Sequence, residues 1–147
     1  MRSALAILSA LWLSAAVPAA GQPPSPAAGQ PPLSGAPDAT SRGEYIVHRV
    51  AMCVQCHSER DDTGRLFVGG LLQGARMPVR SPFPGQSWAF STPKLAGLPS
   101  GYSEAQLSIF LQTGDSGRGR PPRPPMPPFR MTAADATAVV AYLKSLR

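Results

Sequence analysis

The feature that most constrains this chain is the five-residue run Cys53-Val54-Gln55-Cys56-His57. On a helical turn, side chains three and four positions apart project to one side, so both thiols and the imidazole share a face. Two thiols and an adjacent imidazole at this spacing match the attachment motif of a c-type haem. In that chemistry the thiols add to the two vinyl groups of the porphyrin, and the imidazole takes one axial position on the iron. The run therefore predicts a fold that wraps one covalently bound haem c, held by Cys53, Cys56 and His57.

Other uses of two nearby cysteines account for less of the motif. A thioredoxin-like dithiol belongs to an alternating strand and helix pattern, which this sequence lacks. A structural zinc site needs four ligands, and the chain offers two cysteines and two histidines. The second histidine, His48, is expected at an exposed position on the helix before the motif, on the wrong side to be a second axial ligand. A disulfide between Cys53 and Cys56 would close a very small loop, add little stability and leave His57 unexplained.

The first 20 residues have the features of an export signal. Arg2 gives a positive start, residues 4–17 form an apolar run, and the small residues Ala19, Ala20 and Gly21 offer cleavage sites. No later stretch approaches the roughly 20 apolar residues of a membrane-spanning helix, so no permanent span is expected, although an uncleaved signal is an alternative. Thiols kept for covalent attachment are handled outside the reducing cytosol. We therefore expect the mature protein in a bacterial periplasm.

Residues 21–40 differ in composition from the rest of the chain. Pro, Ala, Gly, Ser and Gln dominate this segment, which buries too little apolar surface to offset the entropy of ordering it. We interpret it as a flexible linker, with a proline-rich ligand for a partner domain as the alternative. The folded domain is expected over residues 41–147, and the absence of a second haem motif from the sequence makes it a one-haem domain.

Hydrophobic periodicity predicts an all-α domain of three main helices, with long loops over residues 58–102 that wrap the haem. The first helix is expected from Arg42 to about Gln55, and the second between the capping-box residue Ser103 and a terminating Gly114. The third is expected from 133 to 146, capped by Thr132. The apolar stripes that define these helices comprise Ile46, Val47, Val50 and Ala51 in the first, Leu107, Phe110 and Leu111 in the second, and Ala136, Val139, Val140, Leu143 and Leu146 in the third.

A second axial ligand must come from a distant part of the chain, because His57 and the cysteines hold the ring from one side. Met126 is the preferred candidate, since it lies in the proline-rich segment 121–128, where fixed φ angles can hold a weak thioether ligand in place. Met77, followed by a proline, is the alternative. Met52 adjoins Cys53 on the proximal side, and Met131 precedes the last helix, where packing is its expected role. A solvated proline-rich loop without a ligand role also stays open.

A histidine and methionine pair leaves no open coordination position and raises the potential relative to two imidazoles. The expected function is therefore one-electron transfer through a six-coordinate iron, with no catalytic residues in the polypeptide. The alternative is a haem enzyme or gas sensor with an open or labile distal site. A peroxidase-like enzyme would require a distal acid or base, for which the sequence offers no candidate.

From about Ser41 to the C-terminus the sequence resembles the class I c-type cytochromes. Gly43 and Tyr45 before the motif, Pro127 after Met126, and Tyr142 in the terminal helix carry this resemblance. It implies a small cytochrome c fold in which the first and last helices cross, with Gly43 against Tyr142.

The middle of the chain is similar to the cytochrome subunits of periplasmic or membrane-associated dehydrogenases. The similarity lies in Phe67-Val68-Gly69-Gly70 and in Phe90-Ser91-Thr92-Pro93-Lys94-Leu95. It implies redox protein partners, with a dehydrogenase as electron donor and a cytochrome or an oxidase as acceptor.

The chain is strongly basic, with a net charge of +6. A basic patch at a haem edge can steer an acidic docking surface of a redox partner, although scattered solvated charge is the alternative. Nucleic acid is not expected, because no nucleic-acid-binding motif accompanies the charge. The arginines near the proposed methionine ligand are Arg118, Arg120, Arg123 and Arg130. Candidates to approach the haem propionates are Trp88, Arg76, Arg80 and Lys94.

Overall fold

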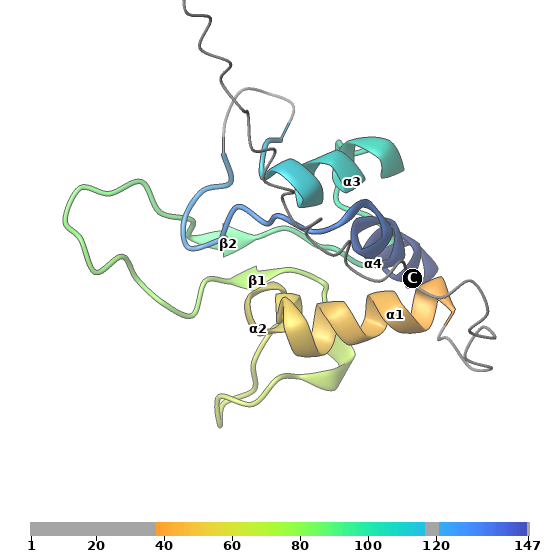
Figure 1. The fold of residues 1–147 in the computed structure, drawn as a ribbon. Helices are drawn as coiled ribbons and strands as arrows, with labels where there is room; N and C mark the ends of the chain where they lie inside the picture. Colours follow the sequence, from red (N-terminus) through yellow and green to blue (C-terminus); the bar gives the residue numbers. More distant parts are fainter. Residues whose placement is uncertain (1–37, 117–120, 147) are drawn as a thin grey trace, which may run out of the picture. The chain divides into compact units, whose positions relative to one another are not determined.

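The computed structural model describes residues 38–116 and 121–146. The expected export signal (residues 1–20) and all but the end of the expected linker (residues 21–40) therefore lie outside the described residues. The described part is mostly helical with little strand (Figure 1). Its elements are helix α1 (Ala39–Tyr45), π-helical turn η1 (Ile46–Val50), helix α2 (Cys53–His57), 3-10 turn η2 (Val68–Gly70), strands β1 (Ala75–Arg76) and β2 (Ser91–Thr92), and helices α3 (Glu104–Thr113) and α4 (Ala133–Ser145).

Helix α1 begins earlier than the sequence predicts. Its N-cap is Asp38, whose carboxylate accepts a hydrogen bond from the Ser41 backbone N–H at 2.9 Å. An aspartate at this position satisfies one of the unpaired amides of the first turn, so the helix starts at Ala39 instead of Arg42. The carboxylate also holds the Ser41 hydroxyl, and these hydrogen bonds lower the pKa of Asp38.

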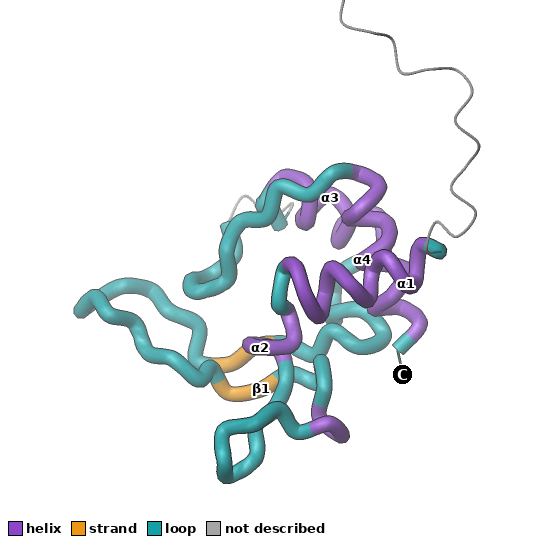
Figure 2. Tube along the Cα trace, turned by 60° about the horizontal axis from the view of Figure 1, so that its bottom comes forward, coloured by secondary structure: helices purple, strands orange, loops and turns teal. Residues whose placement is uncertain are grey.

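The predicted first helix does not continue to Gln55. It passes into the wider turn η1, closed by a hydrogen bond from the Ala51 N–H to the Ile46 oxygen, and ends at Met52. Met52 has a φ of 55°, a left-handed conformation that costs a non-glycine residue about 1 kcal/mol or more. The haem motif consequently forms its own short helix, α2, after a break (Figure 2).

Helices α1 and α4 cross at a glycine, as the sequence resemblance implied (Figure 1). Gly43 is buried against the Ala138 backbone, and a Cβ added to it would lie 2.7 Å from the Cβ of Tyr142. A distance that short is far inside van der Waals contact. The close approach of the two helices therefore requires a residue without a side chain at position 43.

The ends of α3 and α4 agree with the sequence prediction. Ser103 Oγ accepts from the Gln106 N–H, and the Gln106 side chain accepts from the Ser103 N–H at 2.9 Å, which completes the capping box. Gly114 ends α3 with a φ of 70°. Thr132 caps α4 by accepting from the Asp135 N–H.

The core forms where α1, η1, α3 and α4 meet, and one predicted core position, Val50, is wrong. Val50 is 60% exposed, because the wider turn of η1 and the break after it rotate this residue away from the predicted stripe. Ala51 and Leu146 are partly buried and pack against the core. The buried apolar residues of these elements are Ile46, Val47, Leu107, Phe110, Leu111, Ala136, Ala138, Val139, Val140, Tyr142 and Leu143.

The segment expected as loops, residues 58–102, is mostly irregular but contains one small ladder. Strands β1 and β2 pair antiparallel, with Ala75 opposite Thr92 and Arg76 opposite Ser91. Between them, residues 77–90 project away from the helices in both views (Figures 1 and 2). We call residues 77–90 the arm.

Candidate functional site

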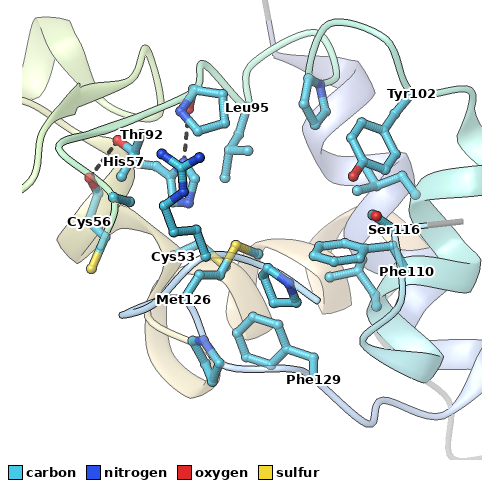
Figure 3. Close-up of a pocket in the computed structure, with 18 of the residues that line it drawn as sticks. Cys53, Cys56, His57, Thr92, Leu95, Tyr102, Phe110, Ser116, Met126 and Phe129 are labelled. Atoms are coloured by element: carbon cyan, nitrogen blue, oxygen red, sulfur yellow. Dashed lines mark hydrogen bonds between the residues drawn. The ribbon is translucent and has the colours of Figure 1, made fainter. Parts of the chain in front are cut away.

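A cavity of about 550 Å³ lies beside α2 and is walled by segments from the whole described length of the domain. Its apolar side is made by the long loops and by the inner faces of α3 and α4. Figure 3 shows Tyr102, Phe110 and Phe129 at one end of this space, with Cys53, Cys56 and His57 arriving from α2. Apolar side chains that line the cavity include Leu95, Pro99, Leu107, Phe110, Leu111, Phe129, Val139 and Leu143.

The five-residue helix α2 brings the three predicted haem-binding side chains to one wall. Cys53, Cys56 and His57 all line the cavity. Both cysteines are free thiols, so no disulfide occupies the motif. In the folded chain, one helical turn therefore presents two thiols and one imidazole to the same cavity, as the spacing of the motif predicts.

His57 is oriented by the loop that follows the arm. Its Nδ1 lies 2.8 Å from the backbone oxygen of Pro93, which can only accept, so Nδ1 carries the proton. The lone pair of the neutral ring is then on Nε2, the nitrogen left for a metal. The side chain is 6% exposed, and burial lowers the pKa of His57, while the Pro93 hydrogen bond opposes that shift. A neutral imidazole is the form that coordinates iron.

Cys53 lies in a poorly solvated part of the wall. Burial raises the pKa of this thiol to about 11, with a smaller contribution from Cys56. The thiol is therefore protonated near neutral pH. Thioredoxin-like exchange requires a thiolate, so this environment is the opposite of the one that activates a redox dithiol.

Two loop residues, Gly74 and Thr92, hold the C-terminal end of α2 by hydrogen bonds. Thr92 Oγ1 donates to the Cys56 backbone oxygen at 2.9 Å, and the Gly74 N–H donates to the His57 backbone oxygen at 2.9 Å. These bonds satisfy carbonyls that the end of a helix leaves unpaired. Gly74 has a φ of 86°, and a Cβ there would lie 2.8 Å from the Thr92 oxygen, so only glycine suits this position.

Ser58, the residue after the motif, extends this fastening. It is buried, and its Oγ accepts from the Leu72 N–H at 2.9 Å. The Leu72 oxygen in turn accepts from the N–H of Leu95, which lines the cavity. The haem motif and the wall after the arm are thus joined through one buried residue.

The predicted distal residue, Met126, lines the same cavity as His57. It reaches the cavity from the proline-rich segment before α4, and Figure 3 shows its side chain directed into the space between α2 and Phe129. Met77 also lines the cavity, so the structure keeps both predicted candidates at the wall. Met52 is 43% exposed, and Met131 packs partly buried against the core, which is the expected role for it.

Several other predicted site residues lie elsewhere. His48 was expected to be exposed, but it is partly buried and its Nε2 lies 2.8 Å from the hydroxyl of Tyr142, so it joins α4 to the first helical segment. Desolvation, and to a smaller extent Glu44, raises the pKa of that tyrosine. Arg118 and Arg120 lie outside the described residues. The candidates for the propionates that do not line the cavity are Trp88, Arg76, Arg80 and Lys94.

Arg123 is the one charged residue among the described residues of the cavity wall. The sequence placed it only in a general basic patch. Thr92, Pro93 and Gly74 were likewise not identified as site residues, although Thr92 and Pro93 belong to the segment that resembles dehydrogenase cytochromes. Their Thr-Pro dipeptide was the available signal, because it follows the motif at a distance that a return loop can span.

The comparisons agree with this site. The family model for cytochrome c matches residues 40–147, which include α2 to α4, all of α1 but its first residue, and the entire haem motif. The chain belongs to the cytochrome c family. It is accordingly a haem-binding electron carrier, of a family that binds haem c and functions in electron transfer, not catalysis. A search of curated proteins found no match. No helix of the described residues is long and apolar enough to cross a membrane.

Proposed function

We propose that this chain is a monohaem one-electron carrier whose iron is held between His57 and Met126. The observation that carries the proposal is that one cavity has both cysteines, His57 and Met126 on its wall. When bound, haem supplies one iron that alternates between the ferric and ferrous states and so holds or releases a single electron. The polypeptide supplies the residues that hold the haem and the apolar cavity around it.

The cavity fits the size and chemistry of such a group. About 550 Å³ lies within the usual range of cofactor pockets, and the wall is mainly apolar with few polar groups. Cys53 and Cys56 offer two thiols, each of which can add its S–H across one vinyl double bond to give a thioether. His57 offers Nε2, with Nδ1 engaged by Pro93.

Met126 is preferred to Met77 as the second ligand because a proline adjoins it on both sides, whereas only one proline adjoins Met77. Its N–H donates to the Arg123 oxygen at 3.3 Å, and the neighbouring Pro124 oxygen accepts from the Ala89 N–H at 2.8 Å. Prolines on either side of Met126 restrict φ. A preorganised segment loses little entropy when a weak thioether ligand binds, and that favours a six-coordinate iron.

We also propose export to the periplasm and exchange of electrons with redox proteins. The apolar run at residues 4–17 after Arg2 supports export, and the two haem-motif thiols agree with an exported compartment. A dehydrogenase as donor and a cytochrome or oxidase as acceptor are supported by the resemblance around Phe67–Gly70 and Phe90–Leu95. The basic balance favours partners with acidic docking surfaces.

Replacement of Met126 tests the ligand assignment. Met126→Ala should abolish the near-red absorption band of ferric iron bound to a thioether sulfur. It should also lower the reduction potential by on the order of 0.1 V, because loss of the thioether favours the ferric state. Both are measured on the purified, haem-loaded protein by absorption spectroscopy and by redox titration.

Met77→Ala is the matched control, since it removes a methionine from the same cavity. It should leave the near-red band in place and change the potential little. If instead Met77→Ala abolishes the band and Met126→Ala retains it, the distal ligand is Met77 and our assignment is wrong.

A further inference from the structure

The arm, whose base lines the cavity, exposes several apolar side chains. Val79 is 51% exposed, Phe83 is 64% exposed and Phe90 is 83% exposed. Phe83 lies at the tip between two prolines. Large exposed aromatic side chains on one loop cost solvation free energy and mark sites of protein contact.

This loop is ordered by its own hydrogen bonds. The Trp88 indole N–H donates to the Val79 oxygen at 3.0 Å, across the arm. Nearer the tip, the Ser81 hydroxyl lies 2.9 Å from the Gln86 side-chain oxygen, and the Phe83 N–H donates to Ser81 Oγ at 3.1 Å. The exposed side chains therefore stand on a preorganised backbone, which lowers the entropic cost of docking.

The base of the arm belongs to the proposed haem site. Met77 and Ala89, near its two ends, line the cavity. The Ala89 N–H binds the oxygen of Pro124, two residues before Met126. A molecule that binds at the base of the arm is thus held beside the cavity wall.

The described charged residues of the arm, of strand β1 beside it and of the cavity wall are all basic. Residues 63–103 and 116–134 contain eight basic residues and no acidic residue, whereas all eight acidic residues of the chain lie outside these two segments. Within the described residues, Arg76 and Arg80 are exposed on and beside the arm, and Arg123 is exposed at the cavity. A surface of apolar side chains among cations complements an apolar patch ringed by carboxylates.

We infer that the arm is the docking element for the redox partner, and that its side chains, Phe83 foremost, enter an apolar patch ringed by carboxylates on that protein. The inference rests on the proposed function, because an electron carrier requires a protein with which it exchanges electrons. A lipid surface would also accept aromatic and basic side chains. The position of the arm beside the cavity favours a protein that holds its own redox centre, since docking here brings that centre near the proposed haem.

Site-directed photocrosslinking in the source cells tests the inference on the full, haem-loaded chain. A benzophenone amino acid replaces Phe83 or, as the matched control, Ile109 of α3, which is 54% exposed. The probe at 83 should give an adduct with a protein that carries a redox cofactor, and the probe at 109 should not. Arg76→Gln with Arg80→Gln, or high salt, should reduce that adduct severalfold, because both weaken attraction between exposed charges.

Electron-transfer kinetics with the partner protein that the cross-link identifies complete the test. Phe83→Ser should lower the second-order rate constant of electron exchange about tenfold or more, the effect of removing a central interface residue, whereas Ile109→Ser should leave it unchanged. The inference is overturned if the probe at 83 links to phospholipid, to a second copy of this chain, to a protein without a redox cofactor or to nothing, or if both probes link equally. Absorption spectra of the same samples separate this failure from that of the proposed function, because they show directly whether haem is bound and whether the near-red band of a thioether ligand is present.

Discussion

At position 43 a single hydrogen atom in place of a side chain sets the distance between two helices. Gly43 is buried against the backbone of Ala138, and Tyr142 packs over it. On the other side of the same contact, His48 reaches the Tyr142 hydroxyl at 2.8 Å. The crossing therefore combines a steric requirement at one residue with a hydrogen bond between two others, and α2 begins only a few residues further along the chain.

Substitution of this glycine should destabilise the fold. In Gly43→Ala the added methyl group meets backbone as well as Tyr142, so the helices must separate. We expect the free energy of unfolding to fall by about 1–3 kcal/mol, the usual cost of overpacking, although alanine favours helix by about 1 kcal/mol. Urea unfolding of the haem-loaded protein measures the change.

Gly69→Ala is the control for this variant. The three atoms nearest to a Cβ at position 69 all belong to the ring of Phe67, a residue that is 53% exposed and can move aside. This variant should unfold near the wild-type midpoint. Equal destabilisation by both substitutions would show that the α1–α4 crossing has no special need for glycine.

At the scale of elements, helices with local boundary signals could be predicted, but the break between the first helix and the haem motif could not. The capping box of Ser103 and Gln106 and the stop at Gly114 lie within a few residues of one another, so sequence alone predicts α3. Met52 carries no such signal. Its left-handed backbone divides the predicted helix, and such a conformation in a non-glycine residue persists only when tertiary contacts impose it.

The capping box should contribute measurably to α3. Ser103→Ala removes the acceptor for the Gln106 N–H, and we expect a loss of about 1 kcal/mol in the free energy of unfolding. Ser103→Asp keeps an acceptor at the N-cap and should restore most of this loss. Thermal unfolding followed by circular dichroism compares the three proteins. A Ser103→Ala protein as stable as wild type would mean that packing against α4 alone fixes the start of α3.

At the scale of the whole molecule, the site is assembled from parts that no local pattern connects. The sequence predicts Cys53, Cys56, His57 and Met126, because each stands in a distinctive run. The structure places all four on one cavity wall. Pro93, Thr92 and Arg123 are found only in three dimensions, because their roles depend on loops that return to α2.

At the same scale, none of the residues predicted to approach the propionates lines the cavity. Arg76, Arg80 and Lys94 were chosen for their charge. A sequence shows that a side chain is charged, but it does not show where the side chain points in the folded protein. These residues lie off the cavity wall, and Arg123 lies on it. The segregation of basic residues into two segments is visible in the sequence, whereas the projection of residues 77–90 as an arm is a property of the fold (Figure 2).

The central claim is that a haem is joined to this polypeptide through Cys53 and Cys56. Its most direct test is the mass of the exported protein after denaturation, which removes any group that is not covalently bound. The mass should exceed that of the mature polypeptide by one haem, and the excess should vanish in the Cys53→Ala, Cys56→Ala double variant. A wild-type mass equal to that of the bare polypeptide would contradict the account.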